Sequence, residues 1–148
     1  VWLVDPARSL VALQKRSPNK DTFPGRWDIS AAGHIESGDE SRPTAVRELA
    51  EELGVICAEG DLDFLGTVPA EQADLGGCNC FEDVYVLRCD SESIAFAVGE
   101  AEVSAVAWMP VGELGERLAA NDPTVVPRTQ AYRDAFFRHL RDAHGCAW

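Results

Sequence analysis

The segment from Ser41 to Leu53 carries the clearest secondary-structure signal in the chain. Val46, Leu49 and Leu53 recur at the spacing of one helix face, which predicts an amphipathic helix packed against a core. Ser41 suits the N-cap position, because its hydroxyl can accept a hydrogen bond from a backbone N–H of the first turn. Gly54 follows the last periodic residue, where a left-handed C-terminal cap is expected. Any fold for this chain must therefore offer an apolar surface to a helix over residues 41–53.

The same helix brings three glutamates together. Glu48 is followed three and four positions later by Glu51 and Glu52, so the side chains share one face, with Cβ atoms about 5–6 Å apart. Like charges at this spacing cost an isolated helix roughly a few tenths of a kcal/mol per pair. A divalent cation bound through the carboxylate oxygens would offset that cost, and Mg²⁺ is the usual choice beside phosphates. The alternative is a solvated acidic face paired with nearby basic residues.

The bulk properties fit a single globular domain spanning residues 1–148. The chain has 148 residues, of which 46% are hydrophobic and 26% charged. Its net charge of -12 argues against non-specific binding to nucleic acid, but a bound metal ion would still admit a phosphorylated small molecule. No apolar run reaches the roughly 20 residues of a membrane span. The chain opens inside a strand-like run without methionine, so we treat a truncated N-terminus as an open alternative.

The cysteines and histidines give little indication of a metal or disulfide framework. The five cysteines are odd in number and follow no signal peptide, which favours a reduced, intracellular chain, cytoplasmic or organellar. Cys78 and Cys80 form a C-x-C pair without a matching second pair, so they support a zinc site only weakly. His139 and His144 show no spacing typical of metal ligands.

The remaining pattern predicts an α/β domain. Strands are expected at residues 2–4, 10–14, 27–32, 62–69, 81–88 and 103–109, and further helices at 111–119 and 129–143. The order of these elements, without an internal repeat, indicates a mixed sheet sandwiched between helices.

Gly33, Asp39 and the run RELAEELGV at residues 47–55 stand at the fixed spacings of a known motif. The stretch Gly33–Val55 resembles the Nudix box, and on it the chain is identified as a member of the Nudix hydrolase family. One position departs from the pattern, because the family usually has glutamate where this chain has Asp39. The resemblance implies a Nudix-type α/β/α sandwich with a mixed sheet, in which a loop–helix–loop presents carboxylates to Mg²⁺ or Mn²⁺.

The resemblance also implies roles for individual residues. Glu48, Glu51 and Glu52 would be the metal-binding carboxylates, and the Gly33 backbone carbonyl a further ligand. Arg47 looks like the residue that orients one carboxylate through a charge-assisted hydrogen bond. The metal ions would neutralise charge on phosphorus while a carboxylate, such as Glu48 or Glu51, removes a proton from the attacking water.

A general base outside the box is a further expectation, because the family often takes one from the loop before a late strand. That loop corresponds to Ser91–Glu102, and its candidates are Glu100 and Glu102. Glu102 is favoured as a catalytic residue because it directly precedes the strand expected at 103–109, which is a firm platform. The alternative is that both are ordinary loop acids.

Residues 13–34, with the segments LQKRS and FPGRWDISAAGH, are similar to the isopentenyl-diphosphate isomerase branch of the family. The isomerases transfer a proton with a cysteine just before the Gly-His pair, where this chain has Ala32. They carry acidic residues in the strand where Cys78 and Cys80 stand here, and they lack the complete box that this chain keeps with Glu48. All three differences favour hydrolysis over isomerisation.

Four residues outside the box are candidates for substrate binding. Arg16 and Lys20 stand where the isomerase branch binds diphosphate. Phe23 and Trp27 could stack on a base or pack on an isoprenoid. The alternatives are a basic loop that offsets the acidic surface and aromatic residues that belong to the core.

Together these observations predict a Mg²⁺- or Mn²⁺-dependent hydrolase that cleaves a diphosphate linkage in a small molecule, a nucleoside diphosphate linked to another group. Three alternatives stay open: an isopentenyl-diphosphate isomerase-like enzyme, a non-catalytic Nudix binding module, and a structural or regulatory piece of a larger protein. The expected partner is a small-molecule diphosphate rather than nucleic acid or a membrane, and a homodimer is a further option.

Overall fold

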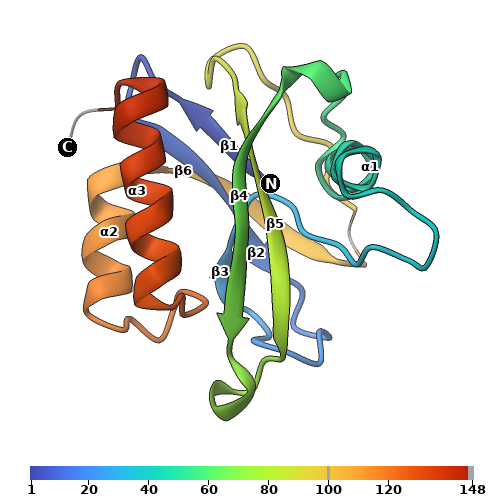
Figure 1. Ribbon diagram of the computed structural model, residues 1–148, viewed down its shortest axis with the longest axis vertical. Helices are drawn as coiled ribbons and strands as arrows, with labels where there is room; N and C mark the ends of the chain where they lie inside the picture. The colour runs from blue at the N-terminus through green and yellow to red at the C-terminus, as the bar shows by residue number, and fades with distance from the viewer. Residues whose placement is uncertain (100, 147–148) are drawn as a thin grey trace.

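The computed structural model describes residues 1–99 and 101–146 and contains one sheet flanked by helices (Figure 1). The strands are β1 (Trp2–Asp5), β2 (Leu10–Arg16), β3 (Trp27–Asp28), β4 (Leu62–Glu71), β5 (Asn79–Arg88) and β6 (Val103–Pro110). The helices are α1 (Ser41–Leu53), α2 (Val111–Ala119) and α3 (Gln130–His144), with 3₁₀ turns at Glu59–Asp61 and Ala73–Leu75. None of the helices in the described ranges combines the length and apolar character needed to cross a bilayer.

The sheet is mixed. Its strand order is β3-β2-β1-β5-β4, and β6 pairs with β2. β1 runs parallel to β5, with Trp2 opposite Val86, whereas the pairs β1–β2, β2–β3, β2–β6 and β4–β5 are antiparallel. β4 lies at one end of this order, and its register with β5 shifts between Phe64 and Gly66, as a β-bulge does.

Helices cover both faces of the sheet, with α1 on one face and α2 and α3 on the other (Figure 1). Successive residues of β1 point to opposite faces, so Leu3 joins the core under α1 while Trp2 joins the core under α2 and α3. Trp2 stacks on Phe136 of α3, with ring centroids 4.3 Å apart. The predicted α/β/α sandwich with a mixed sheet is confirmed.

Helix α1 spans the predicted residues, but one of its caps differs. The N-cap is Glu40 and makes no side-chain capping hydrogen bond, so the expectation that Ser41 caps the helix is wrong. Ser41 is the first helical residue, and the Tyr85 hydroxyl donates to its Oγ at 3.0 Å, which occupies that oxygen. Gly54 is the C-terminal cap as predicted, with a left-handed φ of 69°. Leu53 is fully buried against the sheet.

The third strand is much shorter than predicted. Pairing expected over residues 27–32 is confined to Trp27–Asp28. Beyond it, the Ser30 side chain takes over the bonding: its Oγ accepts the Leu3 N–H at 2.8 Å and donates to the Ala12 carbonyl at 2.6 Å. A side chain that replaces ladder hydrogen bonds lets the chain leave the sheet and turn towards α1.

Candidate active site

Glu52 is the most buried of the three predicted metal-binding carboxylates, with 6% of its surface exposed. Its Oε2 accepts hydrogen bonds from the Gln14 side-chain amide at 2.9 Å and from the Ala32 backbone N–H at 3.0 Å. These bonds join α1 to β2 and to the loop after β3. Burial raises the pKa of Glu52 to about 7, although both hydrogen bonds favour the charged form. A cation beside this carboxylate would restore its charge.

Gly33 and Glu48 approach each other very closely. A Cβ atom on residue 33 would fall 2.0 Å from Cδ of Glu48, and 2.2 Å and 2.5 Å from its two oxygens. Only a residue without a side chain permits such an approach. The fold thus brings together the two residues that the sequence predicts as ligands through a backbone carbonyl and a carboxylate.

The third glutamate of the predicted set, Glu51, is exposed on the same helix. Burial, and then repulsion from Glu51, raises the pKa of Glu48, whose side chain is 17% exposed. Arg47 lies between two acids: its guanidinium is 3.2 Å from Asp39 and 3.9 Å from Glu48. The longer distance leaves the role of Arg47 as an orienting residue a prediction.

The loop before β6 is fastened to the last turn of α1. The N–H groups of Ala97 and Gly99 donate to the carbonyls of Leu53 and Glu52, at 2.8 Å and 2.9 Å. A Cβ atom on Gly99 would fall 2.7 Å from the carbonyl oxygen of Glu51. This close contact holds the loop beside the acidic end of the helix.

Glu102 ends that loop, and it is the favoured candidate for the general base. Its charge contributes to the raised pKa of both Glu48 and Glu52, which places it within electrostatic reach of the other carboxylates. Its side chain is 49% exposed and forms an ion pair with Lys20. Lys20, the second residue predicted to bind diphosphate, therefore lies beside the predicted general base. Glu100, the other candidate base, lies outside the described residues.

The Arg16 side chain is held by hydrogen bonds to nearby residues. Its guanidinium donates to the Thr22 carbonyl at 2.8 Å, to the Thr22 hydroxyl at 2.9 Å and to Asp28 at 3.0 Å. The side chain is only 15% exposed. These bonds brace the loop after β2, so binding of a phosphate by Arg16 remains a prediction.

Phe23 and Trp27 both occupy largely packed positions. Phe23 is 8% exposed, and a Cβ atom on Gly77, in the connection between β4 and β5, would fall 2.9 Å from its ring. Trp27 packs partly buried against the core under α2 and α3. Stacking of either ring on a substrate remains a prediction.

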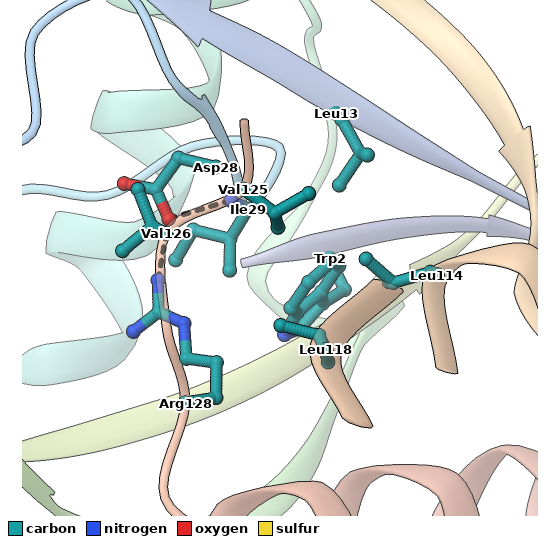
Figure 2. A pocket seen from close by; sticks show the side chains of 9 residues that line it. All are labelled: Trp2, Leu13, Asp28, Ile29, Leu114, Leu118, Val125, Val126 and Arg128. Atoms are coloured by element: carbon teal, nitrogen blue, oxygen red, sulfur yellow. Dashed lines mark hydrogen bonds and ion pairs between the residues drawn. The ribbon is translucent and has the colours of Figure 1, made fainter. Parts of the chain in front are cut away.

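Two residues that support this region had not been singled out from the sequence. Gln14 is a polar residue at a buried position of β2, where its break in the apolar pattern was the available signal. Arg128 is 6% exposed and pairs with Asp28 (Figure 2). It also lies 3.1 Å from Glu82, and no local pattern in the sequence marks it. Its partners come from β3 and β5, so only the folded chain reveals the network.

Cys78 and Cys80 lie where β5 begins, with their sulfur atoms 3.7 Å apart and both residues exposed. In the described part of the chain they belong to no group of three potential metal ligands. The weakly supported zinc site therefore finds no support at these cysteines.

An α/β/α sandwich that presents a glutamate-bearing helix beside a glycine loop is the architecture of the Nudix class. Residues 1–129 match the family model of the NUDIX domain. The chain therefore belongs to the Nudix family.

Proteins of known sequence agree with this assignment. Nudix hydrolase 3 of Arabidopsis thaliana is 39% identical over 132 residues, which cover 86% of this chain but only 17% of that protein. The isopentenyl-diphosphate Delta-isomerase of Jannaschia sp. is 30% identical over 90% of this chain and 77% of its own length. The prenyl-diphosphate phosphatase of Methanosarcina mazei is 27% identical over 97% of this chain and 78% of its own length. The similarity to the isomerase branch is thereby confirmed.

A solved structure agrees at the level of the fold. The NUDIX domain of Shewanella oneidensis NrtR, crystallised with ADP ribose, superposes with a TM-score of 0.66 at 22% identity. The match covers 94% of this chain and 82% of that one.

Proposed function

We propose that the chain hydrolyses a diphosphate linkage in a small molecule, with Mg²⁺ or Mn²⁺ held by Glu48, Glu51, Glu52 and the Gly33 carbonyl. The observation that carries this proposal is the close contact of Gly33 with Glu48 beside the buried Glu52. Burial raises the pKa of both carboxyl groups, and a bound cation would favour their charged forms. Clustered oxygen donors of this kind match the preference of hard divalent cations.

A divalent ion bound here would neutralise charge on the phosphate oxygens and lower the pKa of a coordinated water. The residues of the chain supply the remaining functions. Gln14 and Ala32 hold Oε2 of Glu52, which fixes the orientation of that carboxylate. Glu102 accepts the proton of the attacking water. Lys20, its ion-pair partner, exchanges the carboxylate for a phosphate oxygen of the substrate.

The substrate class that we infer is a nucleoside diphosphate linked to another group. The ADP ribose in the structure of the Shewanella NUDIX domain supports this class, because that ligand has the same chemical form. Arg16 and Lys20 would contact the diphosphate, and Phe23 and Trp27 the base. The name of the Methanosarcina relative makes a prenyl diphosphate the competing class.

Ala32 favours hydrolysis over the isomerase reaction. Its methyl group cannot donate or accept a proton, and its backbone N–H is engaged with Glu52. The stretch in which the isomerases carry acidic residues has Cys78 and Cys80 here. A binding module without catalysis would have the same fold, but it would not need the metal-binding carboxylates of α1.

The test is a turnover assay on the full chain with nucleotide sugars, ADP ribose, dinucleoside polyphosphates, oxidised nucleotides and prenyl diphosphates. We expect product release that requires Mg²⁺ or Mn²⁺. Glu51→Gln should abolish this release by removing a metal ligand, and the variant should still fold because Glu51 is exposed and its replacement leaves the core intact. The matched control is Glu59→Gln, an exposed glutamate in the 3₁₀ turn after α1. Binding of a member of the panel without any turnover would instead support the non-catalytic module.

A further inference from the structure

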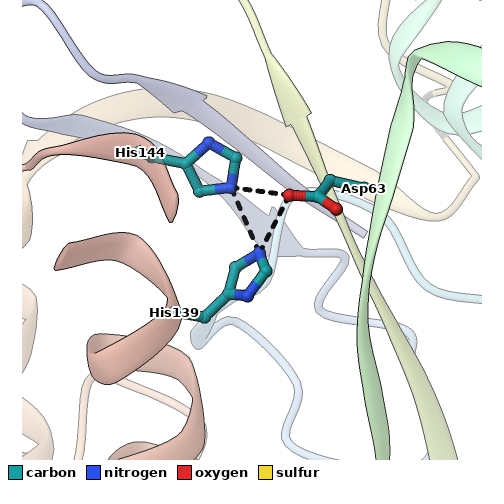
Figure 3. Close-up of side chains that lie close together, drawn as sticks. All are labelled: Asp63, His139 and His144. Carbon is teal, nitrogen blue, oxygen red and sulfur yellow. Dashed lines mark hydrogen bonds and ion pairs between the residues drawn. The ribbon is translucent and has the colours of Figure 1, made fainter. Parts of the chain in front are cut away.

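A second group of potential metal ligands lies far from the glutamates of α1 in the fold. Asp63 of β4 and His139 and His144 of α3 point their side chains at one another (Figure 3). Asp63 Oδ2 is 3.2 Å from Nε2 of His139 and 3.3 Å from Nε2 of His144. The two Nε2 atoms are 3.2 Å apart. The three atoms thus form a nearly equilateral triangle, and α3 lies on the face of the sheet opposite α1 (Figure 1).

Hydrogen bonds alone cannot satisfy this triangle. Each Nε2 carries at most one hydrogen, and a carboxylate oxygen carries none, so two hydrogens at most serve three contacts. If both histidines donate to Asp63, two N–H groups face each other at 3.2 Å. If one histidine donates to the other, the accepting Nε2 carries no hydrogen. Its contact with Asp63 then brings two lone pairs together. A cation at the centre of the three lone pairs removes this conflict.

The size of the triangle indicates which cation would fit. Zinc binds imidazole nitrogen and carboxylate oxygen at about 2.0–2.1 Å in tetrahedral sites, so two of its ligand atoms are about 3.3 Å apart. The observed separations of 3.2, 3.2 and 3.3 Å match that edge. An octahedral Mg²⁺ at about 2.1 Å needs a shorter edge of about 3.0 Å and prefers oxygen ligands. Three protein ligands leave the fourth tetrahedral position for water.

Burial also suits a bound ion. The His144 side chain is only 1% exposed. A neutral imidazole keeps the lone pair that a metal ion requires. The Asp63 side chain is 49% exposed, so an ion can reach the site from solvent.

We propose that Asp63, His139 and His144 form a binding site for a divalent transition-metal ion of the zinc class. The site joins the C-terminal turn of α3 to the outer strand β4. Bound metal therefore stabilises the packing of α3 on the sheet, because it binds the folded arrangement and not the unfolded chain. This proposal does not depend on the reaction at α1.

His139 and His144 are five residues apart and lack the usual spacing of ligands on a helix, but the fold brings both of them to Asp63. Helical ligand pairs usually stand three or four residues apart, on one face. His144 is the last residue of α3, before the left-handed cap Gly145, and the third ligand comes from a strand distant in sequence. A search for local spacing could not find such a site.

The test is Zn²⁺ binding by the full chain after removal of metals with a chelator. Excess Mg²⁺ is kept in the buffer to occupy the carboxylates of α1, and Zn²⁺ is titrated by calorimetry. We expect one tight equivalent that persists in Glu51→Gln. In Asp63→Asn and His139→Gln the affinity should fall at least about tenfold, since even supporting residues of metal sites have effects of this size. The matched control, Asp142→Asn, removes a charge from the same turn of α3 outside the cluster and should bind as the wild type does.

Two further readouts separate metal ligation from hydrogen bonding. Zn²⁺ should raise the Tm of the wild type and of Asp142→Asn but not that of Asp63→Asn. Co²⁺ in place of Zn²⁺ should give the visible absorption of a tetrahedral site, and this band should disappear in His139→Gln. If His139→Gln does not fold, Asp63→Asn decides the test, because Asp63 is exposed enough for its asparagine variant to fold. Equal Zn²⁺ affinity in wild type and Asp63→Asn, or no tight equivalent in the wild type, would overturn the proposal.

Discussion

The backbone N–H of Ala32 donates to Oε2 of Glu52 at 3.0 Å, which ties the loop after β3 to helix α1. The position that carries a proton-transferring cysteine in the isomerase branch is thus a backbone support for a buried carboxylate in this chain. The methyl group of Ala32 adds no chemistry of its own. This one contact joins the two parts of the sequence, residues 13–34 and the box, from which the function was predicted.

Removal of one carboxylate charge should abolish catalysis while the fold persists. We expect Glu51→Gln and Glu52→Gln each to lower kcat/KM by at least about 100-fold, because both weaken the binding of the metal ions that neutralise phosphate charge. Circular dichroism should show the same secondary structure in both variants. Near wild-type turnover in both, at saturating Mg²⁺, would show that these residues do not hold the metal.

The raised pKa of Glu52 predicts how the stability of the metal-free protein depends on pH. Below its ordinary pKa of 4.5 the carboxyl is protonated in the folded and unfolded states, so it does not lower the free energy of unfolding. Between pH 4.5 and about 7 the unfolded chain loses this proton more readily, so the free energy of unfolding falls as the pH rises. Denaturant titrations with a chelator present should show that fall.

Glu52→Gln is the variant that isolates this effect. It should be more stable than the wild type at pH 7 in the absence of metal, and the difference should shrink towards pH 4.5. Saturating Mg²⁺ should stabilise the wild type and remove most of the difference, because the ion binds the folded state. A wild type whose stability rises through this range, relative to the variant, would contradict the assignment of a raised pKa to Glu52.

Gly33→Ala should damage the site through a steric contact. The new Cβ would fall 2.0 Å from Cδ of Glu48, so the carboxylate or the loop must move. Overpacking of this kind costs about 1–3 kcal/mol of stability, and we expect turnover to fall by at least about tenfold as the ligands separate. Gly60→Ala is the control, because nothing lies within 4 Å of a Cβ atom there. Unchanged activity in Gly33→Ala would place the metal elsewhere.

Glu102→Gln tests the general base. If Glu102 removes the proton from water, kcat should fall by roughly 10²–10⁴-fold, with substrate affinity nearly unchanged. If Glu102 is a metal ligand, added Mg²⁺ should partly restore the rate. Lys20→Met removes its ion-pair partner and should act mainly on KM. Wild-type kcat in Glu102→Gln across a Mg²⁺ titration would return the role of base to Glu48 or Glu51.

The sequence predicted those features that arise from local periodicity and from fixed motif spacing. The bounds of α1, its Gly54 cap, the strands other than β3 and the mixed sandwich follow from patterns within short windows. Side chains that compete with the backbone were not predictable in this way. Ser30 ends β3 by bonding to Leu3 and Ala12, and Ser41 bonds to Tyr85, so neither behaves as its local pattern suggests.

The contacts that the sequence could not predict join residues that are distant along the chain. Arg128 meets Asp28 and Glu82, 100 and 46 positions away. His139 and His144 meet Asp63 across the interface of α3 with β4. Only the strand order decides which such residues become neighbours, and a single sequence does not reveal that order.

Hydrolysis of a diphosphate linkage is tested by the fate of solvent oxygen during turnover. The full chain is incubated with a substrate found in the panel in water enriched in heavy oxygen, with Mg²⁺ or with a chelator, and phosphorus NMR follows the products. We expect heavy oxygen to enter one phosphate group of the cleaved diphosphate, only when metal is present, and not in Glu51→Gln. Metal-independent cleavage, or interconversion of isopentenyl and dimethylallyl diphosphates without incorporation of solvent oxygen into phosphate, would contradict this prediction.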